Sequence, residues 1–238
     1  MNFLNMMSGV LVNTATVLIG STIGLLLKKG IPEKISKTVM LALGLCTIYI
    51  GISGSLEGEN TIVLIISMVI GTIIGCLIDL DDKINRLGGL IERKVKHKDG
   101  QTSIAEGFMT ASILFCVGAM TIVGALDAGL TGDNKLYYTK AVMDMISSCM
   151  LASTLGLGVF FAGFFVLIFQ GALVLLAGLL QGLLSNTAMV AEMTCCGSVI
   201  IIGLGLNLLG ITKLKVANFL PAIFLAPLAY ILVQYLPI

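Results

Sequence analysis

Residues Gly118–Gly158 read GAMTIVGALDAGLTGDNKLYYTKAVMDMISSCMLASTLGLG, and here charged side chains lie among apolar segments rather than between them. The charged residues of interest, at the ends of these apolar segments or inside them, are Asp127, Asp133, Lys140 and Asp144. Because a charge inside a bilayer is energetically costly, such residues tend to mark an ion path, a proton relay or a substrate site. We therefore expect the functional site of the chain in this stretch.

The composition of the whole chain is that of a protein dissolved in lipid. Hydrophobic residues make up 57% of the 238 residues, charged residues make up 11%, and the mean hydropathy is +1.06. Soluble domains contain about 25% charged residues, so the composition excludes a water-soluble globule. The apolar runs are continuous and do not alternate with a period of two, which favours helices over barrel strands. We predict an all-α, polytopic transmembrane bundle that forms one domain over residues 1–238.

Eight apolar runs predict about eight spans, and a bundle of seven spans with a re-entrant fifth run is the alternative. The runs are residues 9–27, 38–54, 61–78, 107–126, 139–155, 159–184, 193–211 and 216–235. A basic connector, residues 79–106, separates the third and fourth runs. Its apolar residues over 81–95 recur at helical spacing, so this part is either an amphipathic helix on the membrane surface or a solvated connector.

The distribution of lysine and arginine predicts the orientation of the chain, because basic loops stay on the cytoplasmic side. Eight spans with the N-terminus outside leave only Lys135 and Lys140, of the 14 basic residues, near the outer face. Both termini are then outside, and residues 79–106 are cytoplasmic. Seven spans would move Lys213 and Lys215 outside, which fits the rule less well.

Two groups of three spans resemble each other weakly and suggest an inverted repeat of runs 1–3 and 6–8. The segment VNTATVLIGSTIGLLL begins at Val12 and compares with FQGALVLLAGLLQGLL from Phe169, and each has a carboxamide in second place, Asn13 and Gln170. The members of each pair run in opposite directions in the eight-span bundle, as in many secondary transporters. Chance similarity between apolar segments is the alternative.

Lys140 and Asp144 lie four residues apart, so they share one face of a helix and can neutralise each other. In the functional interpretation Asp144 titrates or coordinates a cation, Lys140 tunes it, and Ser147 adds a hydroxyl ligand. The structural alternative is an ion pair between helices near the membrane interface.

Further polar residues are candidates for an ion path. Asp127 and Asp133 flank a glycine-rich link, where they form either an outer mouth that collects cations or an ordinary turn and N-cap. Asn13, Gln170 and Asn207 are carboxamides in apolar helices. They either hold helices together, at about 1 kcal/mol each, or supply oxygen ligands to an ion.

Other classes of function have little support. The six cysteines lack the CxxC or Cys/His spacing of a zinc site, and no metal is assigned. No phosphate-binding loop, HExxH or GxSxG motif occurs, so we predict neither an enzyme nor a cofactor. The net charge of +1 gives no indication of nucleic acid. The predicted partners are the lipid bilayer, a small cation or proton and, through glycine-rich faces of the first and third runs, a second copy of the chain.

Four phrases carry a resemblance to a known family: FCVGAMTIVGALDAGLTGD from Phe115, KAVMDMISS from Lys140, GLGLNLLGI from Gly203 and VANFLPAIFLAP from Val216. They resemble the uncharacterised bacterial membrane-protein family catalogued as domain of unknown function 554, also called YqgA/YdfK-like. This chain has Asn134 and Met145 where the family pattern has proline and glycine, but it keeps the ionisable groups. The resemblance implies a multi-pass protein of the bacterial inner membrane with a transport-like role.

Together these features predict a secondary transporter or channel for a small cation or small solute. A non-transporting membrane component, such as an assembly or sensor protein that docks partners through the basic residues 79–106, is the alternative.

Overall fold

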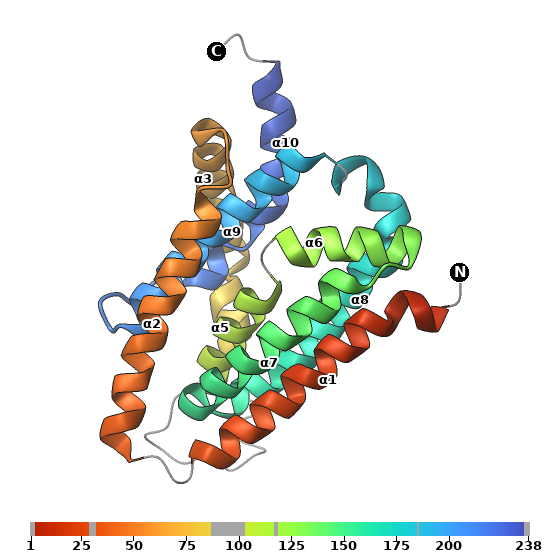
Figure 1. The fold of residues 1–238 in the computed structure, drawn as a ribbon. Coiled ribbons are helices and arrows are strands. Elements are labelled where there is room, and N and C mark those ends of the chain that lie inside the picture. Colours follow the sequence, from red (N-terminus) through yellow and green to blue (C-terminus); the bar gives the residue numbers. More distant parts are fainter. Residues whose placement is uncertain (1–2, 29–31, 87–102, 117–118, 185, 236–238) are drawn as a thin grey trace. The chain divides into compact units, whose positions relative to one another are not determined.

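Long apolar runs become helices because lipid offers no partners for backbone N–H and C=O groups, which must then pair within the segment. A computed structural model describes residues 3–28, 32–86, 103–116, 119–184 and 186–235, and every regular element in these ranges is helical (Figure 1). Within these described ranges, six helices are long and apolar enough to cross a membrane, or seven if a bent pair counts as one span. The prediction of a polytopic helical membrane protein is therefore confirmed.

The chain divides into two compact units. The first comprises residues 1–40, 84–116 and 120–181, and the second comprises residues 41–83, 117–119 and 182–238. The elements of the first unit are α1 (Phe3–Lys28), α5 (Ile104–Cys116), η1 (Asp127–Thr131), α7 (Lys135–Leu155) and most of α6 (Ala119–Leu126) and of α8 (Leu157–Leu184). Those of the second are most of α2 (Glu33–Ser55), then α3 (Thr61–Ile78), α9 (Thr187–Leu208), η2 (Val216–Phe219) and α10 (Pro221–Gln234).

Glycines bring α1 against α7 in the first unit, where the two helices run side by side (Figure 1). Gly20 lies directly against the backbone carbonyl of Met145, and Gly24 lies against that of Cys149, so that neither position has room for a Cβ atom. This close approach confirms the interpretation of these small residues as a packing face. It also brings the polar side chains of α1 to those of α7.

The same device joins α3 to η2 and α10 in the second unit. Gly71 lies against the backbone of Ala222, and Gly75 lies against the carbonyl of Asn218. The glycine faces of α1 and α3, on which we based a possible dimer, are thus occupied by helices of the same chain.

The predicted fourth run is broken rather than continuous. Helix α5 ends at Cys116, α6 begins at Ala119, and the two axes differ by 57°. The π-helical turn η1 then extends α6 to Thr131. Because the sequence is apolar throughout, hydropathy alone does not show this break.

Helix α7 has 21 residues but is not among the helices apolar enough to span, because Lys135, Lys140 and Asp144 lower its hydropathy. The eighth predicted span, over α7, therefore stays a prediction. Most of the predicted amphipathic helix 81–95 lies outside the described residues. The part that is described, residues 81–86, belongs to a helical segment over residues 80–86.

The start of α9 differs from the prediction, and this changes the position of one acidic residue. The helix begins at Thr187 rather than Met193, because the side chain of Asn186 caps it by accepting the N–H groups of Ala188 at 3.0 Å and Met189 at 3.3 Å. Glu192, which the predicted runs leave in the loop before residue 193, therefore lies within the helix.

Candidate functional site

The central feature of the first unit is a buried ion pair on α7. Lys140 Nζ lies 3.0 Å from Asp144 Oδ1 and 2.9 Å from Oδ2, so the ammonium contacts both carboxylate oxygens. Lys140 is 7% exposed and Asp144 is 6% exposed. The spacing of four residues predicts this contact, since such residues are neighbours on a helix surface.

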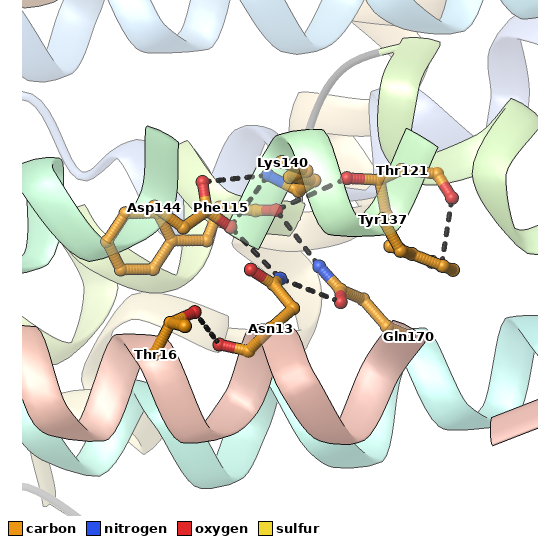
Figure 2. A network of polar contacts seen from close by, with 8 residues as sticks. All are labelled: Asn13, Thr16, Phe115, Thr121, Tyr137, Lys140, Asp144 and Gln170. Atoms are coloured by element: carbon orange, nitrogen blue, oxygen red, sulfur yellow. Dashed lines mark hydrogen bonds and ion pairs between the residues drawn. The ribbon is translucent and has the colours of Figure 1, made fainter. Parts of the chain in front are cut away.

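Two carboxamides extend the pair to two further helices (Figure 2). Asn13, on α1, donates through Nδ2 to Asp144 Oδ2 at 3.1 Å and to Gln170 Oε1, on α8, at 3.0 Å. Neither carboxamide residue has any exposed surface. Three helices that are distant in sequence therefore meet through one continuous chain of hydrogen bonds, which we call the α1–α7–α8 network and define as Asn13, Lys140, Asp144 and Gln170.

The α1–α7–α8 network also reaches the break between α5 and α6. Phe115, next to last in α5, has a carbonyl that accepts Gln170 Nε2 at 3.4 Å and Thr121 Oγ1 at 3.2 Å. Tyr137, on α7, donates its hydroxyl to the carbonyl of Thr121 at 3.1 Å (Figure 2). The Phe115 carbonyl, at the end of α5, thus accepts side-chain donors in place of a helical N–H, as broken helices at membrane depth require.

One acceptor in the α1–α7–α8 network is free. Asn13 Oδ1 is buried and has no hydrogen-bond partner among the residues that the structure describes, although Nδ2 of the same side chain makes two bonds. A buried acceptor without a donor costs free energy. The formal charges of Lys140 and Asp144 cancel, so the ion pair is neutral as a whole. An unpaired oxygen beside that carboxylate is suited to a water molecule or a small cation.

The two aspartates of the glycine-rich link lie apart from the network. Asp127 opens η1, and its backbone carbonyl accepts Thr131 Oγ1 at 2.7 Å. Asp133 is exposed, accepts the backbone N–H of Lys135 at 2.9 Å and pairs with the Lys135 ammonium at 3.5 Å. The hydrogen bond from the Lys135 N–H holds the pKa of the Asp133 carboxyl below its usual value.

The other predicted site residues also lie outside the network. Ser147 is half-buried, and the fully buried hydroxyl one turn from Asp144 belongs to Ser148, which donates to the carbonyl of Met145 at 3.0 Å. Asn207 belongs to the second unit, where Oδ1 accepts Thr212 Oγ1 at 2.7 Å and Nδ2 donates to Leu214 O at 2.8 Å. These bonds close the loop after α9.

Asn134 joins two helices through its side chain, a role that the sequence analysis did not predict. Its Nδ2 donates to the carbonyl of Asn5 at 2.8 Å, and its Oδ1 accepts the N–H of Gly9 at 3.0 Å. Those two backbone groups are related as i and i+4 in α1, so the carboxamide joins the first turns of α1 to the start of α7. In the sequence, Asn134 stood out only because the family pattern has proline at this position.

Comparisons with known proteins agree with this membrane architecture. The family model described as "Protein of unknown function (DUF554)" matches residues 8–231. The uncharacterised membrane protein YdfK of Bacillus subtilis (strain 168) is 32% identical over 232 residues, which cover 96% of this chain and 97% of that protein. The uncharacterised protein YqgA of Escherichia coli (strain K12) is 28% identical over 224 residues, covering 93% of this chain and 95% of that protein.

No solved structure matches the chain. The family model covers nearly all of the sequence, including the four residues of the α1–α7–α8 network. This chain is therefore a multi-pass membrane protein that belongs to the DUF554 family.

Proposed function

We propose that the chain is a secondary transporter or channel for a small cation, the proton included, and that the α1–α7–α8 network is its ion site. The observation that carries this proposal is the connection between a buried ion pair and a broken helix through Asn13 and Gln170. Ionisable residues within a membrane commonly mark ion pathways, and interrupted helices commonly line them.

The chemistry of the proposed site is the exchange of one positive charge for another at Asp144. The ammonium of Lys140 occupies both carboxylate oxygens at rest. A proton on the carboxylate, or a cation bound to it, takes the place of that ammonium, and Lys140 Nζ releases one proton to the ion path so that the total charge does not change. Asn13 Oδ1, which has no partner, supplies a second oxygen to the incoming cation. Only a species of small size and single positive charge keeps the network neutral.

The proposed topology is that of eight spans in the bacterial inner membrane with both termini outside. It counts α7 as a span, whose two buried charges neutralise each other and so lower the cost of insertion. Asp127 and Asp133 lie outside the α1–α7–α8 network and would face the outer side without taking part in ion binding.

The division of the chain into units favours the inverted repeat. The predicted triplets are α1–α3 and α8–α10. Each contributes its first helix to the first unit and its other helices, except the start of α2, to the second unit. Matching halves of this kind are typical of secondary transporters.

Ion flux into proteoliposomes tests the proposal. Purified protein is reconstituted with dyes that report H⁺, Na⁺ or K⁺ inside the vesicles, and each ion is applied as a gradient. We expect flux of at least one ion, and expect Asp144→Asn to abolish it. Asp133→Asn is the matched control, because it neutralises an aspartate outside the network.

The absence of flux for every ion would contradict the proposal and favour the alternative, a component that docks partners through residues 79–106. That alternative predicts loss of function when the basic residues of the connector are neutralised, and tolerance of Asp144→Asn. Most of the connector, residues 87–102, lies outside the described residues.

A further inference from the structure

Asn13 and Gln170 form a chain of hydrogen bonds that begins at Asp144 and ends at the last turn of α5 (Figure 2). Asn13 Nδ2 donates to Asp144 Oδ2 at 3.1 Å and to Gln170 Oε1 at 3.0 Å. Gln170 Nε2 in turn donates to the carbonyl of Phe115 at 3.4 Å. An ionised carboxylate and a backbone carbonyl accept hydrogen bonds and donate none. The two ends of the chain therefore fix which way each carboxamide is turned.

The orientation of Asn13 depends on the negative charge of Asp144. An oxygen that carries a proton or holds a cation no longer accepts the Asn13 Nδ2 hydrogen. Asn13 Oδ1, which is buried and has no partner in the described part of the chain, is the atom of that side chain that suits a positive charge. A half-turn of the carboxamide exchanges Oδ1 and Nδ2 and keeps the shape of the side chain. A positive charge at Asp144 therefore favours the turned carboxamide.

A turned Asn13 also turns Gln170. The oxygen of Asn13 then occupies the place from which Nδ2 donates to Gln170 Oε1, and two acceptors in contact repel each other. Gln170 restores a hydrogen bond by presenting Nε2 to Asn13, which points Oε1 at the carbonyl of Phe115. That carbonyl loses one of its two side-chain donors and keeps the other, Thr121 Oγ1 at 3.2 Å.

We propose that Gln170 is a positioning residue that transmits a positive charge at Asp144 to the end of α5 by reversing this chain of hydrogen bonds. The inference rests on the proposed function, because it requires Asp144 to take up a proton or a cation. The end of α5 responds because helices interrupted at membrane depth depend on neighbouring side chains to satisfy their freed backbone groups. Occupation of the ion site thus loosens the end of α5.

Thr121 provides a matched comparison for Gln170. Both side chains donate to the carbonyl of Phe115. Thr121 is joined to α7 through its own carbonyl, which accepts the hydroxyl of Tyr137 at 3.1 Å, and not through either carboxamide. Its hydrogen bond to Phe115 supports α5 whether or not a positive charge is present at Asp144. Only Gln170 should make the end of α5 sensitive to that charge.

Cys116 is a natural reporter of this change, because it follows Phe115 and is the last residue of α5. Its side chain is buried, so a thiol reagent reaches it only when the structure opens locally. The titratable groups that interact electrostatically with the Cys116 thiol are Tyr137, Lys140 and Asp144. A charge at Asp144 therefore also acts on the thiol directly, and variants are needed to separate the two effects.

Labelling of the purified full-length protein with N-ethylmaleimide in detergent tests the proposal. Peptide mass spectrometry gives the labelling rate of Cys116 relative to that of Cys196, a buried cysteine of the second unit. The ratio is measured in NaCl, KCl, LiCl and N-methyl-D-glucamine chloride at equal ionic strength, and at several pH values. Ion flux is measured separately in proteoliposomes.

In the wild type we expect an alkali-metal ion or acidic pH to raise the ratio about fivefold, the factor that corresponds to one neutral hydrogen bond. Gln170→Met keeps the length of the side chain but has no donor, so its ratio should be high without a cation and rise no further. Thr121→Val should also raise the ratio without a cation, but it should keep the cation-dependent rise. Gln170→Glu serves if Gln170→Met does not fold, because its carboxylate accepts from Asn13 and has no N–H for Phe115.

A wild-type ratio that responds to none of the salts and not to pH would overturn the proposal. A rise in Gln170→Met as large as in the wild type would overturn it as well, because the charge at Asp144 would then act on the Cys116 thiol without Gln170. Either result together with ion flux that requires Asp144 leaves the ion site in place and removes only the connection to α5. The absence of flux for every ion contradicts the proposed function itself.

Discussion

Replacing Lys140 by methionine should destabilise the first unit, because it removes the positive charge from a buried carboxylate. Methionine keeps the length of the aliphatic stem, so packing changes little. Lys140 Nζ contacts both oxygens of Asp144, at 3.0 and 2.9 Å, and each side chain is less than a tenth exposed. Breaking a buried ion pair by removing one partner costs about 3–5 kcal/mol.

We expect a loss near the lower end of that range, about 3 kcal/mol. Asn13 Nδ2 still donates to Asp144 Oδ2, and the carboxyl group can take up a proton in place of the ammonium. Asp144→Asn leaves the ammonium unpaired and should cost a similar amount. The double variant Lys140→Met/Asp144→Asn removes both charges and should recover much of the loss, because replacing a whole buried pair is often nearly neutral.

Reversible unfolding of the four proteins in mixed detergent micelles measures these free energies. The double-mutant cycle should give a coupling energy of about 2 kcal/mol or more. If Lys140→Met costs less than about 1 kcal/mol, as for an exposed pair, or if the two single effects simply add, then the ion pair is not buried and coupled as described. The matched control is Lys135→Met, since its pair with Asp133 is exposed.

Three further outcomes follow from the contacts of the first unit. Gly20→Ala should separate α1 from α7 and lower the free energy of unfolding by about 1–3 kcal/mol in the same assay. Gly178→Ala is the control and should not lower it, because the space around Gly178 is open. Equal effects of the two substitutions would contradict the close approach of α1 to α7. Asn134→Ala should cost about 1–2 kcal/mol, because Asn5 and Gly9 lose its carboxamide. Asp133 should titrate below the usual aspartate pKa in an NMR titration, so that its contribution is complete above that value and is lost as pH falls through the lowered pKa; an ordinary pKa would refute the hydrogen bond from Lys135.

Some contacts of the network were predictable because they depend on local geometry. Lys140 and Asp144 are neighbours on any helix that contains both. The sequence related Asn13 to Gln170 only through the comparison of two apolar segments, and the contact between the two side chains, 3.0 Å from Nδ2 to Oε1, was not predicted. Their role in binding an ion stays a prediction.

Other features depend on groups that are distant in sequence. The break between α5 and α6 is stabilised at Phe115 O by Gln170, from α8, and no local pattern indicates that contact. The position of Glu192 inside α9 was not predicted, although a local pattern does indicate it. Asn186 is a recognisable N-cap residue, and it marks the start of α9. A helix that begins directly after Asn186 contains Glu192.

The most direct test of the ion site at Asp144 is the current that proteoliposomes produce on a solid-supported membrane when the transported ion is applied. Wild-type protein and Asp133→Asn should give transient currents of similar size, because Asp133 lies outside the α1–α7–α8 network. Asp144→Asn should give none, because it removes the carboxylate at which the charge is exchanged. A current from Asp144→Asn equal to that of the wild type would contradict the proposed mechanism.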